Sequence, residues 1–88
     1  MKKIQKRRKV INVTQRDIEM GEPEEPFACP VARAVARAFK KKIGYVGVNG
    51  DEFEMRRGYV KAPKSVETFV NKFDKLETVA PFTFTLEY

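Results

Sequence analysis

Ten basic residues are the side chains of this sequence most suited to a specific interaction, because Lys and Arg neutralise phosphate groups. Some lie at the N-terminus and the rest lie on one arc of a predicted helix. The complete set is Lys2, Lys3, Lys6, Arg7, Arg8, Lys9, Arg33, Arg37, Lys40 and Lys41. We predict that these residues contact the backbone of a nucleic acid. A solvated helix face and a solubilising arm have the same composition, so both alternatives stay open.

The net charge of +6 is concentrated at the start of the chain. Six of the 18 Lys and Arg residues precede Val10, and none of the 12 Asp and Glu residues lies among them. We therefore divide the chain into a basic flexible tail, residues 1–9, and a nearly neutral domain, residues 10–88. Such a tail attracts polyanions through a screened field that does not depend on their sequence.

Histidine is absent and Cys29 is the single cysteine, which excludes several classes of enzyme. The chain cannot form a thiol–imidazole pair, a serine triad with a histidine base or a Cys/His zinc site. Cys29 precedes a predicted helix, where a thiol can become reactive, although a buried capping residue fits the same place. We expect no enzyme activity, no metal and no cofactor.

Carboxylates gather in two places, within residues 22–25 and within residues 51–54. Neither group has the spaced Asp, Asn and Gly pattern of a calcium loop. Solvated loops explain both groups. An acidic patch that meets a basic protein partner is the alternative.

The length of 88 residues predicts one domain with a modest core. No apolar run approaches the roughly 20 residues of a membrane span, and no secretion signal is visible. One cysteine cannot form an internal disulfide, which fits a reducing cytoplasm. We expect a cytoplasmic monomer or weak homodimer that does not associate with membranes.

A strand and a loop are expected before the main helix. Residues 10–13 are rich in β-branched strand formers, and Ile11 and Val13 would face the core. Residues 21–27 hold two prolines and three glutamates, so they form a loop.

A single helical turn is expected between this strand and the loop. Thr14 and Asp17 have the spacing of a capping box in its looser Thr-x-x-Asp form. The turn would cover residues 15–20 and end at Gly21.

The main helix is expected over residues 29–41. Pro30 suits a first helical position, which leaves Cys29 at or beside the N-cap. Apolar residues recur at helical spacing on one face, and basic residues share the opposite arc. The core face holds Val31, Ala34, Val35, Ala38 and Phe39, and the basic arc holds Arg33, Arg37, Lys40 and Lys41. Gly44 lies beyond the helix as a break.

A hairpin with the turn Asn49-Gly50 is expected next, because a type I′ turn favours this pair. Residues 43–48 and 51–56 would be its strands. The predicted pairs are Val48 with Asp51, Val46 with Phe53 and Gly44 with Met55, which buries Val46, Phe53 and Met55 on one face. Gly58 would bend or bulge the second strand before Tyr59 and Val60.

A second helix and a last strand complete the domain. Ser65 would cap a helix that continues to about Leu76. Its narrow apolar stripe holds Val66, Phe69, Val70, Phe73 and Leu76, and the strand that follows alternates Phe82, Phe84 and Leu86 with polar residues.

The predicted order βαββαβ indicates an α+β domain of the ferredoxin-like, split βαβ type. Its antiparallel sheet would be covered on one face by two helices. RNA-recognition motifs share this order and stack bases on aromatic residues of the sheet. Glu52 and Glu54 would occupy that face here and repel phosphate, so we do not expect the same chemistry.

The spacing of several residues resembles that of small single-domain proteins of phages and prophages. The pattern comprises Val13-Thr14-x-x-Asp17-Ile18, Cys29-Pro30-Val31-Ala32-x-Ala34, Phe73-Asp74 and Pro81-Phe82-x-Phe84-x-Leu86. The resemblance implies a phage-type protein and implies no particular chemistry.

Two functions remain possible from the sequence. The first is a non-enzymatic phage-type accessory protein that binds nucleic acid, or a host complex that handles nucleic acid, through the basic helix face and tail. The second is a protein-interaction inhibitor of a host defence complex, acting through an acidic patch or a sheet edge.

Overall fold

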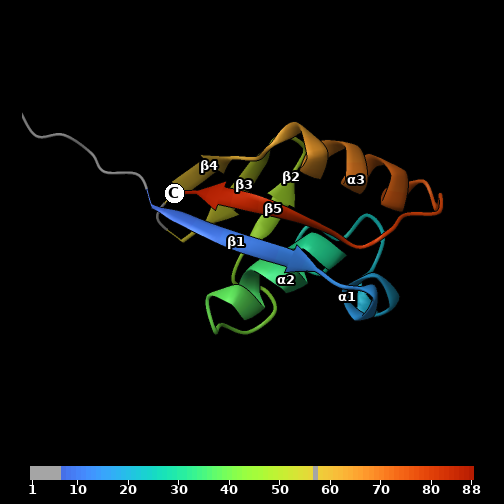
Figure 1. The fold of residues 1–88 in the computed structure, drawn as a ribbon, viewed down its shortest axis with the longest axis horizontal. Coiled ribbons are helices and arrows are strands. Elements are labelled where there is room, and N and C mark those ends of the chain that lie inside the picture. Colours follow the sequence, from blue (N-terminus) through green and yellow to red (C-terminus); the bar gives the residue numbers. More distant parts are fainter. Residues whose placement is uncertain (1–6, 57) are drawn as a thin grey trace, which may run out of the picture.

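Three helices and five strands are present in the computed structural model, which describes residues 7–56 and 58–88. Lys2, Lys3 and Lys6 of the predicted tail lie outside the described residues. The predicted α+β class is confirmed. In chain order the elements are β1 (Arg8–Val13), α1 (Gln15–Met20), α2 (Pro30–Ala38), β2 (Gly47–Asn49), β3 (Glu52–Met55), β4 (Gly58–Lys61), α3 (Lys64–Asp74) and β5 (Phe82–Glu87) (Figure 1). Within the described ranges, none of the helices combines the length and apolar character needed to cross a bilayer.

The strands form two antiparallel sheets rather than the single ferredoxin-like sheet expected from the sequence. β1 pairs with β5 along its whole length, from Arg8 opposite Glu87 to Val13 opposite Phe82. The other sheet has the order β2-β3-β4. Because β3 is paired on both sides, it offers no free edge to β1, and the split βαβ sheet does not form among the described residues.

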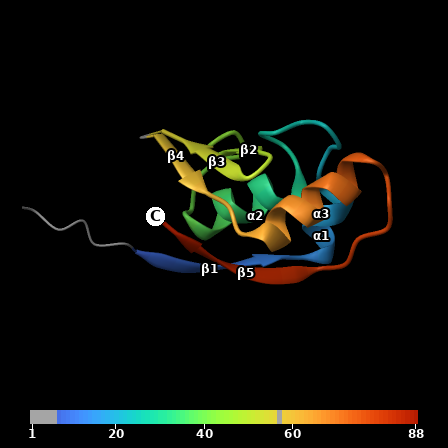
Figure 2. The same ribbon diagram turned by 90° about the horizontal axis from the view of Figure 1, so that it is seen from above.

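The two sheets face each other across the core, and α2 and α3 close the two sides between them (Figure 1 and Figure 2). The prediction that two helices cover one face of a single sheet is therefore wrong. The ring of Phe53 in β3 stacks on that of Phe84 in β5, with centroids 5.9 Å apart and planes 12° from parallel. This contact joins the sheets directly.

The paired terminal strands largely follow the prediction. Ile11 and Val13 of β1 are buried, and so are Phe84 and Leu86 of β5. β1 begins earlier than expected, so Arg8 and Lys9 belong to a strand rather than to the flexible tail.

The predicted capping box of α1 is confirmed. The N–H of Asp17 donates to Oγ1 of Thr14 at 3.2 Å, and the N–H of Thr14 donates to Oδ2 of Asp17 at 2.9 Å. Gly21 ends the helix with a φ of −74°, which any residue can adopt. Glycine is needed there for space, because a Cβ atom would lie 2.5 Å from Cδ of Pro30.

The start of α2 also agrees with the prediction. Pro30 is its first residue, and Sγ of Cys29 accepts a hydrogen bond from the N–H of Ala32 at 3.5 Å. The buried face is broader than predicted, since Ala32 and Ala36 are buried as well. Both are small enough to pack closely against the strands.

α2 ends before Lys40 and Lys41, contrary to the prediction. Lys40 has a φ of 58° and its N–H donates to the oxygen of Arg37, while the N–H of Lys41 donates to the oxygen of Ala36 at 2.8 Å. These two bonds define a Schellman motif, which ordinarily uses glycine at the left-handed position. Lys40, and not Gly44, therefore terminates the helix.

The first hairpin forms, but its predicted register is wrong. Val48, and not Val46, lies opposite Phe53. The turn centres on Gly50 and Asp51, with a φ of 62° at Gly50, as in a type II′ turn with glycine first. Because the register shifts by an even number of residues, Val46, Val48 and Phe53 still face the core.

Gly58 begins a separate strand instead of bending a continuous one. Met55 lies opposite Gly58 and Phe53 lies opposite Val60, so β3 and β4 form a second hairpin. Gly58 has a φ of 136°, which glycine alone adopts without strain. This unpredicted hairpin occupies the second edge of β3.

α3 buries Val66, Phe69, Val70 and Phe73, as predicted. It starts at Lys64, and the residue at the N-cap is Pro63, which has no capping side chain. Ser65 therefore lies inside the helix and is not its cap.

The end of α3 differs from the prediction. Leu76 is 80% exposed and has a φ of 64°, so it does not extend the apolar stripe. The N–H of Leu76 donates to the oxygen of Phe73 and that of Glu77 to the oxygen of Lys72. This is a second Schellman motif without glycine.

Candidate functional site

The carboxylate of Asp17 engages two of the predicted phosphate-binding residues, Arg33 and Arg37. Nη1 of Arg37 lies 2.7 Å from Oδ1 and Nη2 lies 2.8 Å from Oδ2. Nη2 also donates to the backbone oxygen of Asn12 at 2.8 Å. Nε of Arg33 is 3.7 Å from Oδ1. The basic arc of α2 is therefore partly neutralised.

The ion pair keeps both Asp17 and Arg37 charged. Burial raises the pKa of the Asp17 carboxyl, but hydrogen bonds from Arg37 and Thr14 outweigh burial, and the net pKa lies below its ordinary value. The hydrogen bond to Asp17 raises the pKa of Arg37. Since Asp17 is only 1% exposed, these contacts have a structural role that joins α1 to α2.

The basic residues of β1 have different surroundings. Nε of Arg8 lies 3.2 Å from a carboxylate oxygen of Glu87 on the neighbouring strand. Nζ of Lys9 lies 5.2 Å from the centroid of the Phe39 ring. Arg7 continues the ladder, with its N–H donating to the oxygen of Tyr88 at 2.7 Å. Lys9 and Arg7 thus lie beside Phe39 and Tyr88, whose rings contact each other.

Past the end of α2, the Schellman turn separates the two remaining lysines. Lys40 is exposed at the turn. Lys41 lies beside Tyr45, with Nζ 5.9 Å from the ring centroid. Of the four basic residues predicted on α2, Lys41 is the one that lines a cavity.

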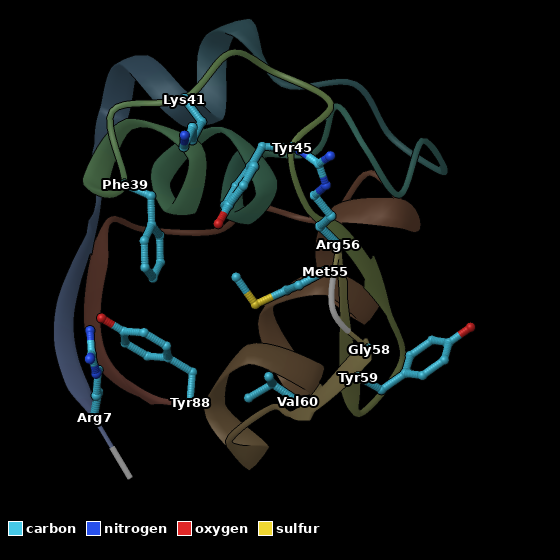
Figure 3. Close-up of a pocket in the computed structure, with 10 residues that line it drawn as sticks. All are labelled: Arg7, Phe39, Lys41, Tyr45, Met55, Arg56, Gly58, Tyr59, Val60 and Tyr88. Atoms are coloured by element: carbon cyan, nitrogen blue, oxygen red, sulfur yellow. The ribbon is translucent and has the colours of Figure 1, made fainter. Parts of the chain in front are cut away.

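A cavity of about 580 Å³, which we call the aromatic cavity, occupies one end of the space between the sheets (Figure 3). Residues from β3, the turn after it and β4 meet there with residues that directly precede β1, follow α2 and follow β5. They are Arg7, Phe39, Lys41, Tyr45, Met55, Arg56, Gly58, Tyr59, Val60 and Tyr88. The described residues of this lining include no Asp or Glu.

The aromatic rings project into the cavity from neighbouring walls. Figure 3 shows Phe39, Tyr45 and Tyr88 directed inward, with Met55 between them, and Tyr59 turned outward. The Phe39 ring lies 5.8 Å from that of Tyr45 and 5.1 Å from that of Tyr88, the latter in an edge-to-face arrangement. Such contacts hold the rings at defined angles.

Three cations surround this aromatic lining. Arg7 directly precedes β1, Lys41 lies in the connection after α2, and Arg56 lies in the turn after β3. Because three cationic side chains and no Asp or Glu side chain are found among the described residues of the lining, the local potential favours an anionic ligand. A planar apolar group with a negative charge fits both the rings and the cations.

The predicted acidic groups lie on other surfaces. Glu52 and Glu54 alternate with buried Phe53, so they point to the outer face of their sheet. Glu54 accepts a hydrogen bond from Asn49 at 3.1 Å.

The second acidic group lies near the start of α2. Glu24, Glu25 and Asp74 line a small cavity of about 190 Å³ beside Cys29. The N–H of Glu24 donates to Oδ1 of Asp74 at 2.8 Å. Among the described residues, no group of three or more ligating side chains could hold a metal ion.

Cys29 has the surroundings of a structural residue. Its side chain belongs to the core and is 2% exposed. Burial raises the pKa of the thiol, which outweighs the hydrogen bonds from the backbone of Ala32 and Val31. A thiol of this kind is a poor nucleophile.

Sequence reasoning identified Arg7 and Lys41 but missed the rings beside them. Phe39 was expected only as a core residue, and Tyr45 and Tyr88 were not expected to meet. No spacing signal could have found them, because each ring comes from a different segment of the chain. Only the folded arrangement brings them together.

No protein-family model matches the chain, and searches of curated proteins and of solved structures find no significant match.

Proposed function

We propose that the protein is a non-enzymatic, phage-type accessory protein that binds nucleic acid, alone or in a host complex. The observation that carries the proposal is the meeting of Arg7, Lys41 and Arg56 around aromatic rings, with no Asp or Glu side chain among the described residues of the lining. Basic grooves with aromatic side chains are typical of sequence-tolerant nucleic-acid binding. We further propose that it acts in the cytoplasm as a monomer or weak homodimer.

We place the main contact with nucleic acid at the aromatic cavity and not on the basic arc of α2. Arg33 and Arg37 are engaged by Asp17, so their charges act at reduced strength. Arg7 and Lys41 line the cavity, and Lys9 of β1 lies beside Phe39, one of the lining residues. Residues 1–6 would add charge without sequence selectivity.

The test is the salt dependence of binding to a labelled oligonucleotide. The logarithm of the association constant should fall linearly with the logarithm of salt concentration, by about 0.7 per phosphate neutralised on single strands. Lys41→Glu combined with Arg56→Glu should weaken binding and flatten this slope. Both side chains are exposed, so the fold should be unaffected.

A matched control is Lys72→Glu. Lys72 is an exposed cation in the last turn of α3, outside the lining of the aromatic cavity. The Lys72→Glu variant should bind the oligonucleotide as tightly as the wild type does. The control reverses one charge and the double variant reverses two, so an equal loss per reversed charge would mean that only net charge matters. Absence of binding at low salt would refute the proposed function.

The alternative, a protein-interaction inhibitor, has one specific observation in its favour. β4 is the edge of its sheet and carries Tyr59, which is 64% exposed. Exposed edges can accept a strand from another protein. This function predicts that Glu52→Lys with Glu54→Lys impairs activity against the partner, while Lys41→Glu has no effect.

A further inference from the structure

We propose that the aromatic cavity receives one unstacked base of a single-stranded nucleic acid, while Arg7, Lys41 and Arg56 contact the flanking phosphates. This inference rests on the proposed function and specifies the form of nucleic acid that is bound. It commits to a single strand because the bases of a duplex are stacked on each other and their faces are not available to a cavity.

The dimensions and lining of the cavity suit a base. Its volume of about 580 Å³ lies within the range of small-molecule sites, which is about 300–1,000 Å³. The inner wall is apolar, formed by Met55 and Val60, and the rings of Tyr45 and Tyr88 flank it (Figure 3). A planar base can therefore exchange water for aromatic and apolar contacts.

The charges lie where the backbone of such a strand would pass. In Figure 3 Arg7 lies beside Tyr88, and Lys41 and Arg56 lie on either side of Tyr45. Phosphates on either side of an inserted base would each meet a cation. Duplex binding would use the same cations without occupying the cavity.

The lining also predicts how selective the site is. Its side chains include no carboxylate and no carboxamide, which are the groups that read the amino groups of cytosine and adenine. Arginine can pair with guanine, but the proposal assigns Arg7 and Arg56 to phosphates. Hydroxyl groups of Tyr45, Tyr59 and Tyr88 are the neutral polar groups available there. We therefore expect stacking with little preference among the four bases.

Tyrosine fluorescence reports directly whether a base occupies the cavity. The chain has three Tyr residues and no Trp, and all three Tyr residues line the cavity. In a Tyr59→Phe variant, emission comes only from Tyr45 and Tyr88, whose rings project inward. Stacking of a base on either ring should quench this emission. Binding of phosphate alone should not.

The experiment titrates the Tyr59→Phe protein with a short single strand, with the same strand made entirely of abasic units, and with its duplex. Binding is followed in parallel by anisotropy of a label on the nucleic acid. We expect the intact strand to bind at least about fivefold more tightly than the abasic strand. We also expect only the intact strand to quench tyrosine emission.

The possible failures are distinguishable. Equal affinity for intact and abasic strands without quenching would overturn base insertion while leaving nucleic-acid binding intact. Tighter binding of the duplex than of the intact single strand would also overturn base insertion and leave nucleic-acid binding intact. Absence of binding to all three ligands would overturn both this inference and the proposed function.

A cavity variant gives an independent check. Tyr45→Leu keeps an apolar side chain and removes the ring, and Tyr45 is only half-buried. Affinity for the intact strand should drop at least about fivefold, and affinity for the abasic strand should stay unchanged. Equal losses for both strands would contradict the proposal. If this variant does not fold, the quenching experiment still decides.

Discussion

The guanidinium of Arg37 binds both oxygens of the Asp17 carboxylate, at 2.7 Å and 2.8 Å. Paired hydrogen bonds between two charged planar groups are stronger and more directional than a single contact. Arg37 also donates to the backbone of Asn12 at the end of β1. A helix as short as α1 has little stability of its own. We infer that this contact, together with the Thr14 capping box, holds α1 against α2.

Replacement of Asp17 by Asn should therefore lower the free energy of unfolding by about 2 kcal/mol or more, through loss of charged hydrogen bonds and of a capping partner. Urea denaturation followed by circular dichroism would measure it. Glu19→Gln is the matched control, because it removes one carboxylate from the exposed face of the same helix. Similar losses in both variants would contradict a special role for Asp17.

Stability should also depend on pH through Asp17. Its pKa is lower in the folded protein than in the unfolded chain, so its contribution is fully present above the unfolded value of about 4 and is lost as pH falls through the folded value. Denaturation midpoints between about pH 7 and pH 2 should fall in acid, less steeply in Asp17→Asn. An identical acid slope in both proteins would argue against this assignment.

Leu76→Gly should stabilise the protein. Leu76 has a φ of 64° and is 80% exposed, so its side chain contributes strain and little packing. Glycine relieves the strain, and after allowance for its greater freedom in the unfolded chain the gain should be about 0.5–1 kcal/mol. The melting temperature should rise for Leu76→Gly and fall for Glu77→Gly, because Glu77 is not in the left-handed region.

Gly21→Ala should destabilise the protein for a steric reason. The φ of Gly21 is ordinary, but a Cβ atom would come within 2.5 Å of the Pro30 ring at the start of α2. Overpacking of this kind costs about 1–3 kcal/mol. Thermal unfolding of the variant would test it, and an unchanged melting temperature would show that α2 can move away from this loop.

The thiol of Cys29 should react slowly with an alkylating reagent in the folded protein. It is 2% exposed, and burial raises its pKa, so little thiolate is present at neutral pH. Mass spectrometry after brief treatment should find Cys29 unmodified, and addition of denaturant should restore rapid reaction. Rapid alkylation without denaturant would indicate a reactive site.

The first hairpin shows why the strand register could not be predicted from the sequence. Asn49-Gly50 correctly predicted a reversal, but a turn one residue later keeps Val48 and Phe53 on the buried face. Local preference could not separate the two registers, because both bury the same faces. In the observed register Phe53 packs on Phe84, a residue from the far end of the sequence.

Several local features of the fold were determined by the sequence itself. Cys29 and Pro30 start α2, and Thr14 and Asp17 cap α1. The alternating pattern of β5 buries Phe84 and Leu86. These features depend on residues that are near neighbours in the sequence. The tertiary structure alone decided the division into two sheets, the pairing of Arg37 with Asp17 and the meeting of Arg7, Lys41 and Arg56 at one cavity. Each of these three features requires segments that are far apart in the sequence, because such segments compete to pair with the same strand edge, to bind the same carboxylate or to fill the same part of the fold. Such competition is resolved only when the whole chain packs.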